Sequence, residues 1–144
     1  MSQKVKVKNG FFEHLSQEFI TEFKKKIFEP KIVGFRFSQL LTKLREAAKP
    51  YVIEKEKLID QYAVRGEKGV IVGPNGEVML TDPLSFNREL KAIQDIDVDI
   101  DIDMVEINLD ELVVQIRDEK SNQIIESSLS IDEFEFITPF AEIK

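Results

Sequence analysis

The chain has 144 residues, of which 42% are hydrophobic and 33% charged, which favours one folded domain over residues 1–144 and excludes a disordered chain. Its net charge of -7 divides into +6 over residues 1–68 and -13 over residues 69–144, and the acidic excess disfavours general binding to nucleic acid. No cysteine is present, which excludes disulfides, a thiolate nucleophile and cysteine-based metal sites.

A strand and a helix are predicted first. Valine and lysine alternate from Lys4 to Lys8, the period of a strand with one buried face, and Asn9-Gly10 ends this strand. Apolar residues then recur at helical spacing, which predicts an amphipathic helix from Phe11 to about Phe28. Glu29-Pro30 stops this helix, because proline cannot continue it.

A second helix is expected to follow. Ser38 can cap its N-terminus with the side-chain hydroxyl, and leucine and alanine form an apolar stripe behind it. Pro50 lies inside the pattern and should kink or split the helix, since proline lacks the N–H and clashes with the preceding turn. The helical pattern resumes from Val52 to Tyr62.

A hairpin and a third helix come next. Gly69–Val72 and Glu77–Leu80 read as two short strands, and Asn75-Gly76 between them supplies the positive φ angles of a tight reversal. Asp82-Pro83 predicts a helix start, since aspartate caps free N–H groups and proline fits the first turn. This helix is expected to end near Gln94.

The segment from Asp95 to Met104 reads DIDVDIDIDM, which predicts a strand with one acidic and one apolar face. The alternation changes phase where Met104 is followed by Val105. A β-bulge at that point would let Ile107 and Leu109 continue on the buried face.

Two strands and one short element complete the chain. Val113–Arg117 and Ile124–Leu129 are expected to pair around a turn at Asp118–Gln123. In residues 130–138, the sequence Ser-Ile-Asp-Glu matches a capping box and predicts a short helix, whereas Phe-Glu-Phe favours a strand; we prefer the helix. The order of elements predicts an α+β fold, in which a small antiparallel sheet packs against amphipathic helices.

Five aspartates stand on one face of the acidic strand: Asp95, Asp97, Asp99, Asp101 and Asp103. Neighbouring members are about 6.6 Å apart, twice the strand rise, so they repel one another. Calcium is one candidate partner, but an EF-hand loop needs glycine at its sixth position, where this segment has Ile100. An extended chain also cannot wrap around one ion, so we expect no metal site.

Three other interpretations of this aspartate row stay open. The row could imitate the phosphates of a nucleic acid and occupy a basic groove of another protein. It could pair with the strand that carries Lys4, Lys6 and Lys8, which has the same period and the opposite charge, within one chain or between copies. It could also be an ordinary solvated face. We prefer the pairing, which leaves at least two carboxylates for solvent or a partner.

Few residues could support catalysis. His14 is the single histidine and lies beside an apolar residue of the first predicted helix, which is typical of a surface or boundary position. Asp118-Glu119-Lys120 follows a predicted strand, as an acid-x-Lys motif does in some metal-dependent nucleases, yet it also lies in a polar turn. Glycine-rich phosphate-binding motifs do not occur. We therefore predict no enzyme and no cofactor.

Several pieces of the chain together resemble a known family. They are Asn9-Gly10 before a helix, the helical stretch LTKLREAAKPYVIEKEKLIDQY, the hairpin GEKGVIVGPNGEVML, the helix start DPLSFNREL and the acidic strand after it. From Leu40 to Val105 the chain is similar to short, uncharacterised proteins encoded by phages of Gram-positive bacteria. The resemblance implies a phage gene whose product works through protein contacts, and it supplies no catalytic residues.

The sequence thus predicts a non-enzymatic phage protein that acts through protein–protein contacts, most directly a virion or assembly component that binds copies of itself or other phage subunits. The alternative is an acidic host-directed inhibitor, an anti-defence or DNA-mimic protein that places the Asp95–Asp103 ladder in a basic groove of a host protein. We expect neither direct nucleic-acid binding nor a membrane segment. The expected location is the host cytoplasm, either free or incorporated in the virion.

Overall fold

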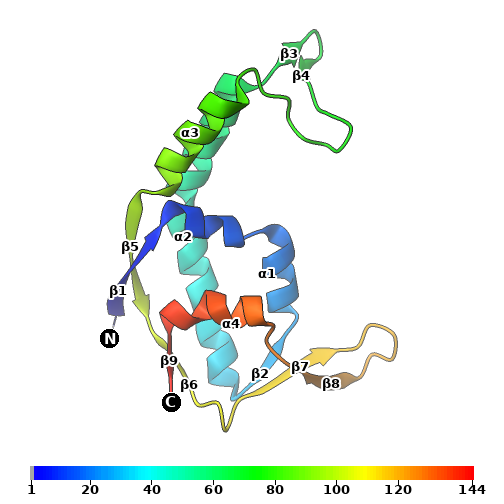
Figure 1. Cartoon of the computed structure of the whole chain (residues 1–144). Coiled ribbons are helices and arrows are strands. Elements are labelled where there is room, and N and C mark those ends of the chain that lie inside the picture. Colours follow the sequence, from blue (N-terminus) through cyan, green and yellow to red (C-terminus); the bar gives the residue numbers. More distant parts are fainter. Residues whose placement is uncertain (1) are drawn as a thin grey trace.

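The computed structural model describes residues 2–144 and has the predicted α+β fold (Figure 1). Its helices are η1 (Asn9–His14), α1 (Gln17–Lys24), α2 (Lys31–Tyr62), α3 (Pro83–Gln94), α4 (Ile131–Ile137) and η2 (Thr138–Phe140), where η marks a 3-10 helix. Its strands are β1 (Ser2–Lys8), β2 (Ile27–Glu29), β3 (Arg65–Gly66), β4 (Gly69–Val70), β5 (Asp97–Asp103), β6 (Val105–Ile107), β7 (Val113–Arg117), β8 (Ile124–Ser127) and β9 (Ala141–Ile143).

The strands form several small sheets around α2. β1 pairs with β5, β2 with β7 and β7 with β8, all antiparallel, as is the short pair of β3 and β4. β6 and β9 differ, since they run parallel. The predicted small antiparallel sheet is therefore divided into separate pieces, of which the β1–β5 and β2–β7 pairs contact α2.

The core lies where the first half of α2 meets β5, β6 and the C-terminal elements. Its most completely buried side chains are Phe37, Leu44, Ile102, Val105, Ile107, Ile137 and Phe140. Aromatic rings fill much of the space, and the ring centroids of Phe11 and Phe136 are 5.0 Å apart in a stacked pair. This core joins the N-terminal and C-terminal segments of the chain.

α2 is one continuous helix of 32 residues, and neither Ser38 nor Pro50 bounds it. Ser38 lies inside the helix and donates its hydroxyl proton to the Gly34 carbonyl at 3.2 Å, so the prediction that it caps the helix is wrong. Pro50 is exposed and does not split the helix. A proline inside a helix costs about 3 kcal/mol; burial of Leu44 on one side and Leu58 on the other offsets this cost.

The predicted helix from Phe11 to Phe28 is also wrong in its continuity, because this segment forms η1, α1 and β2 in turn. Ser16 explains why a new helix begins after η1. Its hydroxyl oxygen accepts a hydrogen bond from the Phe19 N–H at 3.1 Å, which caps a new helix at Gln17. Phe28 then enters the core from β2, where its neighbour across the ladder is Val114 of β7.

The C-terminal end of α2 packs beside α3, and the two helices form a stalk that carries residues 63–81 away from the core (Figure 1). α3 begins as predicted: Pro83 is its first residue, and the Asp82 carboxylate accepts a hydrogen bond from the Ser85 N–H at 3.1 Å. The helix ends at Gln94, also as predicted. We call residues 63–81 the arm.

The predicted hairpin in the arm is partly confirmed. Its reversal is present, since the Gly76 N–H donates to the Gly73 carbonyl at 3.0 Å and Gly76 has a positive φ of 80°. Asn75 does not have the positive φ predicted for it, because it is a central residue of this turn together with Pro74. The predicted ladder between Gly69–Val72 and Glu77–Leu80 is reduced to one bridge, Val72–Val78, and the strand β4 pairs with β3 instead. Further backbone hydrogen bonds join the short segments of the arm: the Val64 N–H donates to the Met79 carbonyl at 2.8 Å, and the Met79 N–H donates to the Ile71 carbonyl at 3.0 Å.

The end of the acidic strand differs from the predicted bulge. β5 stops at Asp103, opposite Ser2 at the start of β1, and the chain then enters a second sheet as β6 beside β9. Ile107 is buried as expected, but Leu109 is half exposed, so the prediction for that residue is wrong.

The C-terminal elements match the preferred prediction. Residues 130–138 begin with the capping box: the Glu133 N–H donates to the Ser130 hydroxyl oxygen at 3.1 Å, and the Ser130 N–H donates to the Glu133 carboxylate at 2.8 Å. The strand interpretation of this segment is wrong. β7 and β8 pair around the predicted turn, with the second strand ending at Ser127 instead of Leu129.

The molecule is extended for its mass. Its accessible surface is 10033 Å² for 16.7 kDa. A compact monomer of that mass exposes about 7,600 Å². The arm at one end and the β7–β8 hairpin at the other account for the shape, as Figure 1 shows. Roughly 2,400 Å² of surface is therefore exposed in excess of the compact value.

Candidate protein-interaction surfaces

The lysine strand and the acidic strand pair within one chain, which confirms the preferred interpretation of the aspartate row. The charged pairs across the ladder are Lys4–Asp101, Lys6–Asp99 and Lys8–Asp97. The apolar pairs between them are Val5–Ile100 and Val7–Val98, which face the core. The matching period and the opposite charge therefore select this register.

The charged pairs are those whose side chains come closest. The Asn9 N–H donates to the Ile96 carbonyl at 2.9 Å, which makes this a hydrogen-bonded pair, and by alternation the lysine–aspartate pairs are non-hydrogen-bonded. In such pairs the Cα atoms are about 4.5 Å apart. No ion pair within 4 Å joins these lysines and aspartates in residues 2–144, so the groups attract through solvent and do not form fixed bridges.

Cations of α2 flank the other edge of β5. The alternation directs the backbone groups of Asp101 away from β1, and the Lys43 ammonium donates to the Asp101 carbonyl at 3.3 Å. Arg36 lines the same small hollow as Asp103, one end of the acidic strand. The strand therefore has basic residues of its own chain on both sides.

Asp95 does not belong to this row, which corrects the predicted ladder. Its N–H donates to the Lys91 carbonyl at 2.9 Å, so it caps the C-terminus of α3, and β5 begins at Asp97. The sequence alternation starts before the helix has ended, which explains the error. Four exposed aspartates remain on β5 against three exposed lysines on β1.

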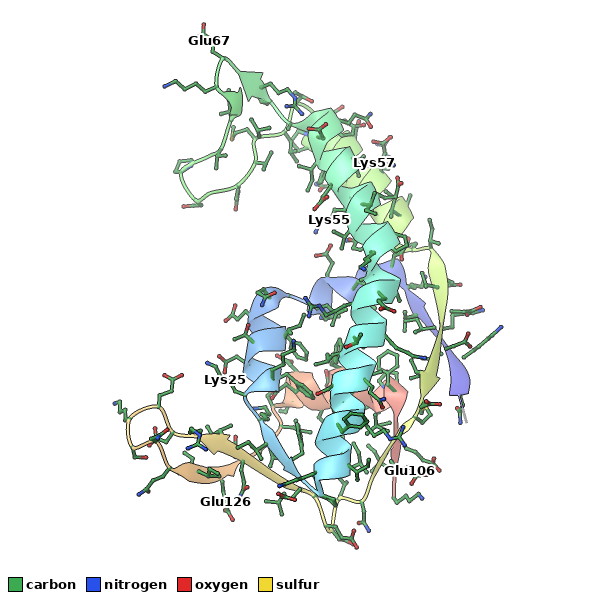
Figure 2. The ribbon with its side chains drawn as sticks, turned by 180° about the vertical axis from the view of Figure 1, so that it is seen from behind. Lys25, Lys55, Lys57, Glu67, Glu106 and Glu126 are labelled. Carbon is green, nitrogen blue, oxygen red and sulfur yellow. The ribbon has the colours of Figure 1, made fainter. Side chains whose placement is uncertain are left out.

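The arm presents apolar side chains that the sequence analysis did not single out as a surface. Between 37% and 55% of each is exposed: Val70, Ile71, Val72, Val78 and Met79. The number of these apolar residues in the sequence could have indicated the exposed surface, since two strands of three or four residues cannot bury five large side chains. Figure 2 shows Glu67 at the outer end of the arm, far from Glu106 and the core.

A shallow apolar hollow lies beside α4 at the other end of the molecule. It is lined by Leu129, Ser130, Ile131, Phe134, Glu135, Thr138 and Pro139. Ile131 is 78% exposed although it is the first residue of the helix. Asp132 and Glu135 are exposed acids of the same helix and have no ion-pair partner in the part of the chain that the structure describes. We call this surface the α4 hollow.

A buried ion pair fixes α4 in place. The Lys26 ammonium lies 3.3 Å from the Glu133 carboxylate, and both side chains are nearly buried. The second carboxylate oxygen of Glu133 has no hydrogen-bond partner. Because Glu133 also caps its own helix, this residue couples the end of α1 to α4 and positions the α4 hollow.

A second polar cluster joins the stalk to the core. The Glu13 carboxylate accepts hydrogen bonds from the Tyr51 hydroxyl at 2.5 Å and the Lys55 ammonium at 2.6 Å, and the Gln94 amide donates to the Tyr51 oxygen at 3.1 Å. Burial alone would raise the pKa of Glu13, but the bonds from Lys55 and Tyr51 outweigh it and hold this pKa below its ordinary value. Burial and the bond to Glu13 raise the pKa of Tyr51 to about 12. The cluster links η1, α2 and α3.

The residues considered for catalysis lie apart from one another. His14 is exposed at the end of η1. Asp118 closes the β7–β8 turn: its carboxylate accepts hydrogen bonds from the Lys120 N–H and the Ser121 hydroxyl, and the latter is the main cause of its lowered pKa. Within residues 2–144, no three His, Asp or Glu side chains gather in a way that could hold a metal ion.

Comparisons with known proteins leave the chain without a family. No protein-family model matches the sequence, and neither a curated protein nor a solved structure shows significant similarity. The resemblance to phage proteins therefore stays a prediction. Across residues 2–144, no helix combines the length and the apolar character that crossing a bilayer requires.

Proposed function

We propose that the protein is a non-enzymatic subunit that works through contacts with other protein chains, most directly as a component or assembly factor of a phage particle. The observation that carries the proposal is the apolar arm on an extended molecule. Exposed apolar side chains in one patch are typical of interaction sites. Their burial against a partner gains about 25 cal/mol per Å² of apolar surface.

The amount of exposed surface supports the same proposal. The excess over a compact chain is roughly 2,400 Å² on each molecule, and a standard protein–protein interface buries about 800 Å² on each partner. The excess is therefore large enough for more than one such interface. The sequence resemblance over Leu40–Val105 is the ground for placing this assembly in a phage, with the host cytoplasm or the virion as its location.

A host-directed inhibitor is the second proposal. It is favoured by the four aspartates on the exposed face of β5. It is the weaker proposal, because Lys4, Lys6 and Lys8 lie directly opposite three of these acids and Lys43 contacts the strand from α2. A mimic of nucleic acid needs an acidic surface without neighbouring cations.

Two experiments test the proposed function. Light scattering coupled to size-exclusion chromatography at low and high salt should show association of the pure protein that survives 1 M salt, because apolar contacts are not screened. Mass spectrometry of purified virions of the encoding phage should find the chain in them. A protein that is monomeric at all concentrations and absent from virions contradicts the assembly proposal. Displacement of DNA from a host protein would then support the inhibitor.

A further inference from the structure

We propose that η1 (Asn9–His14) is a clamp that holds the stalk at one angle to the core, and that opening this clamp lets the stalk swing about Pro50 with the arm at its end. The stalk consists of the C-terminal end of α2 and of α3 beside it. This device goes beyond the proposed function, because it concerns a motion within one chain and not the identity of a partner. It sets the direction in which the arm points.

Pro50 is the point at which α2 bends. Proline has no N–H, so the carbonyl of Glu46, one turn earlier, cannot accept the usual helical hydrogen bond from residue 50. Figure 1 and Figure 2 both show that α2 changes direction between its first and second halves. Helices bend at prolines, because the ladder of hydrogen bonds is interrupted there. α2 is therefore weakest where the stalk leaves the core.

Beyond this point the stalk packs largely on itself. Leu58 of α2 and Phe86 of α3 are buried, but neither belongs to the cluster of buried side chains that forms the core. The rings of Tyr62 and Phe86 meet edge to face, with their centroids 6.0 Å apart. α3 packs against the core near its C-terminal end, through Leu90 and Ile93. The stalk can therefore tilt as one body while most of its own contacts persist.

The chain connects the stalk to the core at two places, and η1 contacts both of them. The first place is α2 immediately after Pro50. There the Glu13 carboxylate of η1 accepts hydrogen bonds from the Tyr51 hydroxyl at 2.5 Å and from the Lys55 ammonium at 2.6 Å. Lys55 lies on the stalk side of Pro50, so its bond ties η1 to the second half of α2.

The second connection runs from the end of α3 into β5. The Asn9 side-chain amide donates to the Ile93 carbonyl at 3.1 Å, and the Asn9 N–H donates to the Ile96 carbonyl at 2.9 Å. Gly10 lies so close to Gln94 that a Cβ atom at position 10 would be 3.4 Å from that side chain. Contacts from one short helix thus fix both connections.

The bonds of Glu13 are the part of the clamp that opens. The side chains of Glu13 and Lys55 are 40% and 31% exposed, whereas only 9% of Asn9 is exposed. A partly exposed ion pair is weak, because water competes for both charged groups. The contacts of Asn9 therefore persist as the pivot when the bonds between Glu13 and α2 break.

A small change at the hinge moves the arm a long way. From Tyr51 to Tyr62, α2 is about 18 Å long at the helical rise. A change of about 20° in its direction, the size of a sharp kink, moves its far end by about 6 Å. The arm begins at the next residue, so it moves with the end of the helix.

The distance between two spin labels measures this tilt. The chain has no cysteine, so Glu18→Cys on α1 and Gln61→Cys near the end of α2 provide unique and exposed labelling sites. α1 lies beside α2 in Figure 1, and so this distance changes when the stalk tilts. An excess of unlabelled protein removes distances between copies. The result is therefore independent of self-association and of the proposed function.

Pulsed electron paramagnetic resonance should give one narrow distance distribution in the chain with an intact clamp. Glu13→Ala removes the bonds to α2, and we expect a broader distribution that extends to distances shifted by about 6 Å. Lys55→Met removes the cation alone and should give part of the same change. Glu54→Ala is the matched control, since its exposed pair with Lys57 lies within α2, and it should leave the distribution narrow. Circular dichroism checks that each variant folds.

Pro50→Ala tests the hinge itself. In the Glu13→Ala background it should narrow the distribution again, because alanine restores the N–H that bonds to the Glu46 carbonyl. Two outcomes overturn the inference. A distribution that stays narrow in both Glu13→Ala and Lys55→Met shows that η1 does not set the angle of the stalk. Broadening that persists when Pro50→Ala is added shows that the motion does not occur at this hinge.

Discussion

Inverting the charge of Lys6 tests the pairing on which the fold depends. Lys6 lies opposite Asp99 in a non-hydrogen-bonded pair, with Asp97 and Asp101 as its diagonal neighbours on β5. An opposite-charge pair in this position contributes roughly 0.2–1 kcal/mol, and a like-charge pair costs a similar amount. Lys6→Glu removes the attraction and adds repulsion, so we expect a loss of about 1 kcal/mol in the free energy of unfolding.

The assay is a double-mutant cycle by urea unfolding. Lys6→Glu and Asp99→Lys should each destabilise, and the swapped double variant should recover at least half of the combined loss. Lys49→Glu is the control, because Lys49 is an exposed lysine of α2 without an ion pair in residues 2–144. In 1 M salt the coupling should largely vanish. Additive losses in the cycle, or coupling that is unchanged by salt, would refute the reasoning.

Three further predictions concern stability. Phe140→Ala should lower the free energy of unfolding by about 3–5 kcal/mol in urea, since the ring is completely buried and its loss leaves a cavity; a loss under 1 kcal/mol would mean that the site collapses or is not buried. Lys26→Met should cost about 3–5 kcal/mol, because it leaves the Glu133 carboxylate buried without its cation, and Lys24→Met, at an exposed lysine, should cost far less; equal losses would contradict the buried pair. The stability that depends on a neutral Tyr51 is present below pH 10, the ordinary pKa, and is lost as the pH rises towards the folded-state pKa of about 12. Thermal melting should show this loss in the wild type and a smaller one in Tyr51→Phe, and identical pH profiles would exclude the tyrosine as its cause.

The acidic strand and its partner could be predicted from sequence because both carry the information locally. Two segments with period two and opposite charge, Lys4–Lys8 and Asp97–Asp103, have one register that buries all the aliphatic residues and opposes unlike charges. The start of α3 and the capping box of α4 were predictable for the same reason, since aspartate before proline and Ser-x-x-Glu act on the nearest backbone groups.

Other elements could not be predicted, because tertiary contacts override the local signals. Pro50 has the local character of a helix breaker, yet α2 passes through it, held by side chains that the core buries on either side. Ser38 was predicted to cap α2, but the helix already begins at Lys31 after Pro30, so Ser38 lies in its interior. β2 pairs with β7 immediately before that start. The β2–β7 pairing is not visible in the local sequence.

The interaction surfaces show the same division. The apolar content of the arm was readable in Val70-Ile71-Val72, but its exposure was not, since exposure depends on the stalk that holds the arm away from the core. The α4 hollow is positioned in part by the ion pair between Glu133 of α4 and Lys26, which is far from α4 in the sequence. No local sequence pattern predicts this hollow.

Hydrogen–deuterium exchange at two protein concentrations tests the central claim, that other chains cover the arm, most directly. At a concentration where light scattering detects association, amides of the arm should exchange more slowly than at high dilution. The β1–β5 ladder should stay unchanged, because it is internal to one chain. Unchanged exchange in the arm under associating conditions, or slowing confined to β1 and β5, would contradict the account.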